Sequence, residues 1–182
     1  MFRLIVFDLD GTLVDSRRDI ADAANALLES CDANSLPEDR IGRMVGDGAA
    51  TLVARAFAAS GIERPEDALD RYLAFYSTRL LAHTRPYPGI AAVLRTLAES
   101  AALAVLTNKP LASTREILDG LDLARYFSAG AVIGGDGPYA RKPDPSGLRH
   151  LAVAAAVPLN ATLLVGDSII FLPAPPAPYA SR

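Results

Sequence analysis

Short apolar runs alternate with amphipathic helical patterns along much of the chain. The runs at residues 2–9, 102–107, 131–134 and 162–166 are mostly apolar, as is typical of strands buried on both faces of a parallel sheet. Between them, apolar residues recur at helical spacing, for example in 90–97 and 148–155. Strands that alternate with helices in this way predict βαβ units, and therefore an α/β fold with a doubly wound parallel sheet.

The segment 14–84 departs from this alternation because it is predicted to be helical, with no strand. Apolar residues recur at helical spacing in three stretches, 20–31, 52–57 and 69–80. The Arg-Pro-Tyr-Pro-Gly stretch at 85–89 marks the end of the segment. An insertion just after the first strand can fold over the carboxyl ends of the sheet strands, where open α/β sheets bind ligands. We therefore predict a helical cap domain at 14–84, inserted into a core domain formed by 1–13 and 85–168.

The composition limits the classes of function. Of the 182 residues, 51% are hydrophobic, which is ample for a buried core and excludes wholesale disorder. A formal net charge of −3 without a basic tract argues against nucleic-acid binding. No apolar run reaches the roughly 18 residues needed to cross a bilayer, and the N-terminal run, which Asp8 and Asp10 interrupt, lacks the features of a secretory signal. With Cys31 as its single cysteine, the chain is predicted to be cytoplasmic, with no internal disulfide and no membrane partner.

The strongest local motif is Asp8-Leu9-Asp10-Gly11-Thr12, at the end of the first predicted strand. Alternation along a strand places Asp8 and Asp10 on the same side, at the carboxyl end where the chain turns. Two neighbouring carboxylates repel each other, so the pair needs a counter-charge from a divalent metal or a lysine. The structural alternative is a tight Asp-Gly turn in which Asp10 caps the local backbone.

The other three predicted strands also end in polar residues. Thr107-Asn108-Lys109-Pro110 follows the second strand, Lys142-Pro143 follows the third, and Gly166-Asp167-Ser168 follows the fourth. Taken singly, Thr107 is equally well explained as a helix cap, Lys142 as a solvated lysine and Asp167 as a turn residue. Four strand ends that each deliver polar groups to one edge of the sheet favour a functional site there.

In their order and placement, these four motifs resemble those of the haloacid dehalogenase superfamily of hydrolases, which shares a Rossmann-like core. The resemblance is greatest to the phosphoglycolate phosphatase branch and covers residues 2–168. Branch-specific matches are Val45-Gly46-Asp47-Gly48 in the cap, 85–89 at the cap exit, and Val132-Ile133-Gly134-Gly135-Asp136. The resemblance suggests that the loop at 46–48 is lowered from the cap to help choose the substrate; a plain helix N-terminus is the alternative.

The resemblance also implies roles for individual residues. Asp8 is expected to be the nucleophile that forms an aspartyl-phosphate, and Asp10 the general acid and then the general base. Asp8, the Asp10 backbone carbonyl and Asp167 are expected to hold Mg²⁺. Three aspartates against one Mg²⁺ and one lysine give a net charge of zero before the substrate arrives. The residues expected to bind the substrate are Thr12, Thr107, Asn108 and Lys142.

The chain departs from the family pattern after Ser168. The family usually has a second acid four residues beyond Asp167, whereas position 171 is Phe171, and the tail at 169–182 is rich in proline. We expect a core that is truncated at its C-terminal end. The strand that precedes Asp167 would then be an exposed, apolar edge that favours low stability and self-association.

The resulting hypothesis is an Mg²⁺-dependent phosphatase that hydrolyses a small phosphorylated acid, with 2-phosphoglycolate as the first choice. A sugar-phosphate phosphatase of the same superfamily is one alternative. A weakly active or non-catalytic protein that keeps the fold is the other. A dehalogenase ranks lower, because Asp10 and a metal ion have no clear task in displacing halide from carbon.

Overall fold

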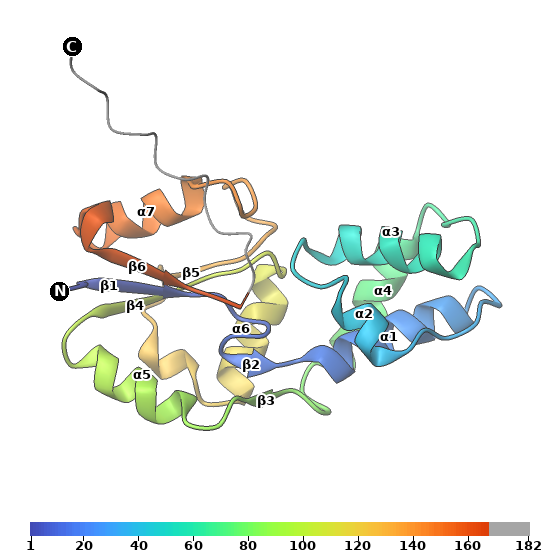
Figure 1. Cartoon of the computed structure of the whole chain (residues 1–182), viewed down its shortest axis with the longest axis horizontal. Helices are drawn as coiled ribbons and strands as arrows, with labels where there is room; N and C mark the ends of the chain where they lie inside the picture. The colour runs from blue at the N-terminus through green and yellow to red at the C-terminus, as the bar shows by residue number, and fades with distance from the viewer. Residues whose placement is uncertain (168–182) are drawn as a thin grey trace, which may run out of the picture.

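A four-stranded parallel sheet forms the centre of the larger lobe in the computed structural model, which describes residues 1–167 (Figure 1). Its strands are β1 (Leu4–Phe7), β4 (Ala102–Leu106), β5 (Val132–Ile133) and β6 (Thr162–Val165), in the order β5-β4-β1-β6. In register, Leu4 of β1 lies opposite Ala102 of β4 and Thr162 of β6. The predicted α/β class with a parallel sheet is confirmed.

Helices cover both faces of this sheet. The helices α5 (Ile90–Ala98) and α6 (Leu111–Gly120) lie on one face, and α7 (Ser146–Ala154) lies on the other (Figure 1). Alternate residues of β1 point to opposite faces of the sheet. Ile5 and Phe7 pack in the apolar cluster on the side of α6, while Leu4 and Val6 pack in the cluster under α7. Short 3₁₀ turns at Ala124–Tyr126 and Leu159–Ala161 precede β5 and β6.

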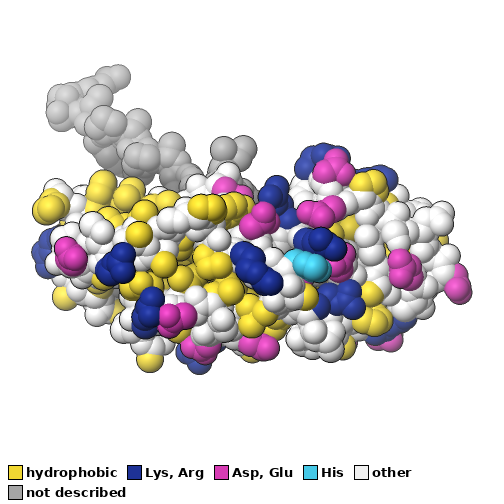
Figure 2. Space-filling model, turned by 90° about the horizontal axis from the view of Figure 1, so that it is seen from below, with side chains coloured by type: hydrophobic (Ala, Val, Ile, Leu, Met, Phe, Trp, Pro, Cys, Tyr) yellow, Lys and Arg dark blue, Asp and Glu magenta, His cyan; other side chains and the backbone are white. Residues whose placement is uncertain are grey.

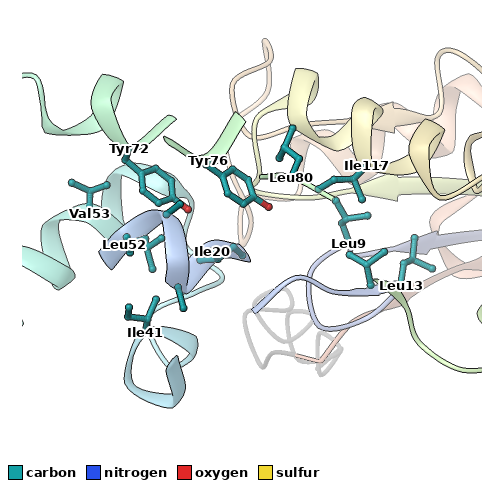
Figure 3. Packing of buried hydrophobic residues seen from close by; sticks show 14 of the residues in the cluster. Leu9, Leu13, Ile20, Ile41, Leu52, Val53, Tyr72, Tyr76, Leu80 and Ile117 are labelled. Carbon is teal, nitrogen blue, oxygen red and sulfur yellow. The ribbon is translucent and has the colours of Figure 1, made fainter. Parts of the chain in front are cut away.

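A second, helical lobe stands beside the carboxyl ends of the strands. It contains α1 (Arg17–Glu29), α2 (Glu38–Gly42), α3 (Ala49–Ser60) and α4 (Ala68–Ser77) (Figure 1). The predicted apolar stripes supply its buried residues, among them Leu27, Phe57 and Tyr72. Figure 3 shows how Ile20 and Leu52 pack with the tyrosines of α4, next to the core residues. The short α2 was not among the predicted elements.

The two lobes are joined by a narrow antiparallel ribbon of β2 (Val14–Asp15) and β3 (Arg85–Pro86). The fully buried carboxylate of Asp19 in α1 anchors the chain that returns from the helical lobe. It accepts hydrogen bonds from the Thr84 amide and hydroxyl, both at 2.7 Å, and from the His83 amide at 2.9 Å. The segment 14–84 was predicted to contain no strand, and β2 at its start shows that this prediction is wrong there. The expected ends of the cap, at 14 and 84, lie next to this ribbon.

Within residues 1–167, β6 is the edge strand beside β1, as expected. The tail expected at 169–182, and Ser168 itself, lie outside the described residues. None of the helices in the described part of the chain is long and apolar enough to cross a membrane. On the face shown in Figure 2, Lys and Arg side chains are interspersed with Asp and Glu.

Candidate active site

The loop that follows β1 is fixed by its own apolar residues. Leu9 and Leu13 are fully buried, and the Leu13 amide donates to the Leu9 carbonyl at 2.9 Å (Figure 3). Between them, Gly11 has φ of +78°, a left-handed conformation that disfavours other residues. The sequence therefore folds into a rigid turn that holds Asp8 and Asp10 at the mouth of the sheet.

Asp8 has defined partners for both of its carboxylate oxygens. Its Oδ1 accepts a hydrogen bond from the Leu9 amide at 2.8 Å, and its Oδ2 lies 2.6 Å from Nζ of Lys142. Burial raises the pKa of Asp8 above its ordinary value, although the Lys142 ammonium opposes this rise. The two expected site residues, from strand ends far apart in the sequence, thus meet as a buried ion pair.

The Asp10 side chain turns away from this pair toward the helical lobe. One oxygen accepts from the Ser16 hydroxyl at 2.5 Å, and the other lies 3.2 Å from Nζ of Lys109. Its backbone carbonyl accepts no hydrogen bond from residues 1–167. The Asp10 side chain therefore points toward the cap, while its backbone carbonyl remains on the core, where it can act as a metal ligand.

Asp167 lies directly against the turn. A Cβ atom on Gly11 would come within 2.0 Å of Asp167 Oδ2, so only glycine leaves room for the carboxylate there. Asp8, Asp10 and Asp167 line one pocket of about 420 Å³. Among residues 1–167, no hydrogen bond or ion pair engages the Asp167 carboxylate. Two carboxylates and a spare carbonyl are hard oxygen donors, and this donor set fits Mg²⁺.

Another group of possible metal ligands lies in the helical lobe. Asp19, Asp22 and His83 bring one donor atom each within 4.8 Å of one another, the one such group in the described part of the chain. Asp19, however, already accepts hydrogen bonds from the backbone at both oxygens. We assign this group a structural role in joining α1 to the end of the helical lobe.

Three expected substrate ligands remain, Thr12, Thr107 and Asn108. Thr107 is buried at the end of β4, and its Oγ1 accepts from the Lys109 amide at 3.2 Å. The backbone amide of Asn108 has no acceptor in residues 1–167, and the buried Thr12 hydroxyl has no partner there either. The Asn108 side chain contacts the Lys142 backbone, so the Asn108 amide is a spare donor near a lysine, which suits an anion such as phosphate.

The Asn108 side chain has a role that sequence reasoning missed. Its Nδ2 donates to the carbonyls of Gly46, at 2.9 Å, and Lys142, at 3.1 Å, while its Oδ1 accepts from the Lys142 amide at 2.9 Å. Gly46 belongs to the predicted cap loop, and Gly48 of the same loop lies near Arg141. Asn108 therefore ties the cap loop and the lysine loop together at one strand end.

A second, smaller pocket of about 50 Å³ lies between the lobes, and Asp10 lines both pockets. The walls of the smaller pocket are mostly apolar and come from α1, α3, α4 and the cap loop at 45–48. The core contributes Asp10, Asn108, Lys109 and Pro110. The buried Lys109 ammonium donates to the Tyr76 hydroxyl at 2.6 Å and lies 4.4 Å from the centre of that ring.

Sequence reasoning did not assign Lys109 and Tyr76 to the site. Lys109 adds a positive charge to the balance of three aspartates, one Mg²⁺ and Lys142, which gives +1 instead of zero. In the sequence, the position of Lys109 directly after Thr107-Asn108 could have indicated that it belongs to the site. Nothing in the apolar stripe that contains Tyr76 distinguished it from a core residue.

A parallel sheet with an inserted helical lobe, and carboxylates and a lysine at the strand ends, indicate an α/β enzyme with a site for an anion and a metal ion. The family model of haloacid dehalogenase-like hydrolases matches residues 2–174, and the chain belongs to this family. The match extends past Ser168, where we expected the resemblance to end.

Relatives and solved structures place the chain within the family. A phosphoglycolate phosphatase of Rhodospirillum rubrum is 45% identical over 177 residues, covering 92% of this chain and 73% of the relative. One of Cereibacter sphaeroides is 41% identical, with 90% and 76% covered. A crystal structure of a predicted phosphoglycolate phosphatase from Haemophilus somnus 129pt has a TM-score of 0.85 at 31% identity, covering 91% and 77%. The expected family and branch are confirmed, and the expected enzyme class, phosphoric monoester hydrolase, agrees with these relatives.

Proposed function

We propose that the protein is an Mg²⁺-dependent phosphatase that hydrolyses 2-phosphoglycolate to glycolate through an aspartyl-phosphate. The observation that carries the proposal is the buried Asp8 carboxylate, 2.6 Å from the Lys142 ammonium and open to a pocket that Asp10 and Asp167 also line. The names of the relatives supply the substrate.

In this proposal Asp8 is the nucleophile. A carboxylate oxygen of Asp8 forms a bond to phosphorus while the bond from phosphorus to the leaving-group oxygen breaks. The hydrogen bond from the Leu9 amide and the ion pair with Lys142 fix the direction of the carboxylate, so little reorganisation is needed before attack.

Asp10 is the general acid and base of the proposed reaction. Its carboxylate lies between the two pockets, where a leaving oxygen would sit with phosphorus on the Asp8 side. In its carboxylic acid form, Asp10 donates a proton to the departing alkoxide. The resulting carboxylate then takes a proton from the water that attacks the aspartyl-phosphate, which breaks the Asp8–phosphorus bond and releases phosphate. Ser16 and Lys109 hold the carboxylate in this position.

The phosphoryl oxygens are proposed to bind at Lys142, the Thr107 and Thr12 hydroxyls, and the Asn108 amide. Within residues 1–167, neither the Thr12 hydroxyl nor the Asn108 backbone amide has a hydrogen-bond partner. Each can donate to an anion, and together with the lysine they neutralise charge as it shifts during phosphoryl transfer.

Mg²⁺ would be held by the Asp8 carboxylate, the Asp10 carbonyl and Asp167. When bound, Mg²⁺ supplies positive charge that neutralises the phosphoryl group and the carboxylates around it. The proposal also places the enzyme in the cytoplasm, which rests on the sequence features given above.

The experiment is a turnover assay of the full chain with 2-phosphoglycolate, a sugar phosphate and p-nitrophenyl phosphate, each with Mg²⁺ and with a chelator. We expect Mg²⁺-dependent release of phosphate, with the highest kcat/KM for 2-phosphoglycolate, and its abolition in Asp8→Asn. Higher kcat/KM for the sugar phosphate would favour the alternative phosphatase. Absence of turnover in a folded, Mg²⁺-saturated sample would favour the non-catalytic alternative.

A further inference from the structure

The smaller pocket between the lobes combines apolar walls with a buried ammonium group. The Lys109 side chain is only 5% exposed, and the Asp10 carboxylate, 3.2 Å away, is the anionic partner that offsets the cost of burying its charge. Its partners, Asp10 and Tyr76, use two of the three N–H donors of an ammonium group. Residues 1–167 provide no hydrogen-bond acceptor for the third donor.

Tyr76 supplies a second donor at the same place. Its hydroxyl oxygen accepts the bond from Lys109, so its own O–H proton can be donated elsewhere. Burial, together with the negative charges of Asp10 and Asp19, raises the pKa of Tyr76 well above its ordinary value and keeps the hydroxyl protonated. Figure 3 shows Tyr76 between Tyr72 and the core residues, with its hydroxyl toward the core.

We propose that Lys109 and Tyr76 form a subsite for a carboxylate on the leaving group of the substrate. A carboxylate accepts hydrogen bonds and donates none, so it matches two donors that line one apolar pocket. The subsite rests on the proposed phosphatase function, in which Asp10 separates phosphorus from the leaving group.

The size of the pocket restricts the leaving group. One water needs about 10–15 Å³ of such space, so a pocket of about 50 Å³ holds roughly three to five positions of that size. Two arginines near the site are less suited to the task. Arg17 and Arg43 line the larger pocket, but both are exposed and each is already paired with a neighbouring aspartate.

The test compares 2-phosphoglycolate with n-propyl phosphate, which has a leaving group of similar length without the charge. Lys109→Met and Tyr76→Phe are each expected to lower kcat/KM for 2-phosphoglycolate about 10- to 100-fold more than for n-propyl phosphate, mainly through KM. Arg125→Met and Tyr126→Phe, at residues that line neither pocket, are the matched controls and should leave the ratio of the two kcat/KM values unchanged.

Equal losses on the two substrates would overturn the subsite, because Lys109 and Tyr76 would then act only by positioning Asp10 or the cap. Calorimetry on Asp8→Asn with Mg²⁺ separates this proposal from the proposed activity, because it measures binding without turnover. We expect this variant to bind 2-phosphoglycolate more tightly than n-propyl phosphate, and the added Lys109→Met substitution to remove the difference. Equal affinity for the two ligands before that substitution would refute the subsite, whether or not the wild-type protein has activity.

Discussion

Replacement of Asn108 tests whether one side chain holds the cap loop and the lysine loop together. Asn108→Ala removes three hydrogen bonds, two to Lys142 and one to Gly46, at 2.9 to 3.1 Å. At about 1 kcal/mol for each bond, the expected loss is about 3 kcal/mol in the free energy of unfolding. For a domain of this size, that corresponds to a fall of about 6 to 12 °C in the melting temperature.

Asn108→Asp is the sharper variant because it keeps the shape of the side chain. The remaining Oδ1 still accepts from the Lys142 amide, but a carboxylate oxygen replaces Nδ2 and faces the carbonyls of Gly46 and Lys142. We therefore expect Asn108→Asp to be destabilised at least as much as Asn108→Ala, and to have a higher KM because the cap loop and Lys142 shift.

Urea unfolding and steady-state kinetics with p-nitrophenyl phosphate measure the two effects. The matched control is Asn25→Asp in the cap, where the Asn25 amide group makes the same kind of paired contact with the Leu36 backbone, at 2.9 and 2.8 Å. This control should lose stability without a change in KM. Wild-type stability in Asn108→Asp, or a KM effect no larger than that of Asn25→Asp, would refute the reasoning.

Three further predictions concern the acidic turn and its neighbours. When a chelator keeps the site free of metal, burial raises the pKa of Asp8 in the folded protein above its ordinary value of 3.8. Between pH 3.8 and this raised pKa, the folded protein therefore binds more protons than the unfolded chain. Its stability relative to Asp8→Asn should therefore fall as pH rises from 3.8 through the raised pKa, as measured by thermal unfolding across pH. Mg²⁺ should raise the melting temperature of the wild type but have less effect on Asp167→Asn, in a titration by differential scanning fluorimetry. Gly11→Ala should lower the free energy of unfolding in urea by at least about 1–2 kcal/mol, because alanine disfavours the left-handed backbone at this position. It should also weaken the Mg²⁺ response, because the new Cβ displaces Asp167.

The elements that sequence reasoning located correctly are those in which periodicity and burial coincide. The strand β1 has four buried residues in a row, and α3 buries Leu52, Val53, Ala56 and Phe57 at helical spacing. The single-turn α2 has one buried residue, Ile41, which is too little for a periodic signal. Pattern therefore predicts long elements well and short connecting turns poorly.

The residues of the candidate site also differ in how well the sequence predicts them. Asp8, Thr107, Lys142 and Asp167 all follow strands, and because parallel strands end at one edge of the sheet, the topology is sufficient to bring these residues near one another. The direction of a side chain after that point depends on packing. The Asn108 amide group faces two backbone loops, which the sequence gives no means of predicting.

Lys109 shows why the leaving-group half of the site depends on both lobes. Its backbone belongs to the core, directly after the phosphoryl ligands, but its ammonium group contacts Tyr76 of α4 and Asp10 of the turn. If the helical lobe moved away, Lys109 would lose the Tyr76 hydroxyl and ring, and the small pocket would lose most of its apolar walls. Asp8 and Lys142 are paired within the core and would keep that ion pair, although Asn108 would lose its hydrogen bond to Gly46 of the cap loop. In the proposed mechanism, catalysis and substrate choice therefore depend on different contacts. We expect substitutions in the walls of the small pocket to change which leaving group is accepted without altering the proposed nucleophile, Asp8.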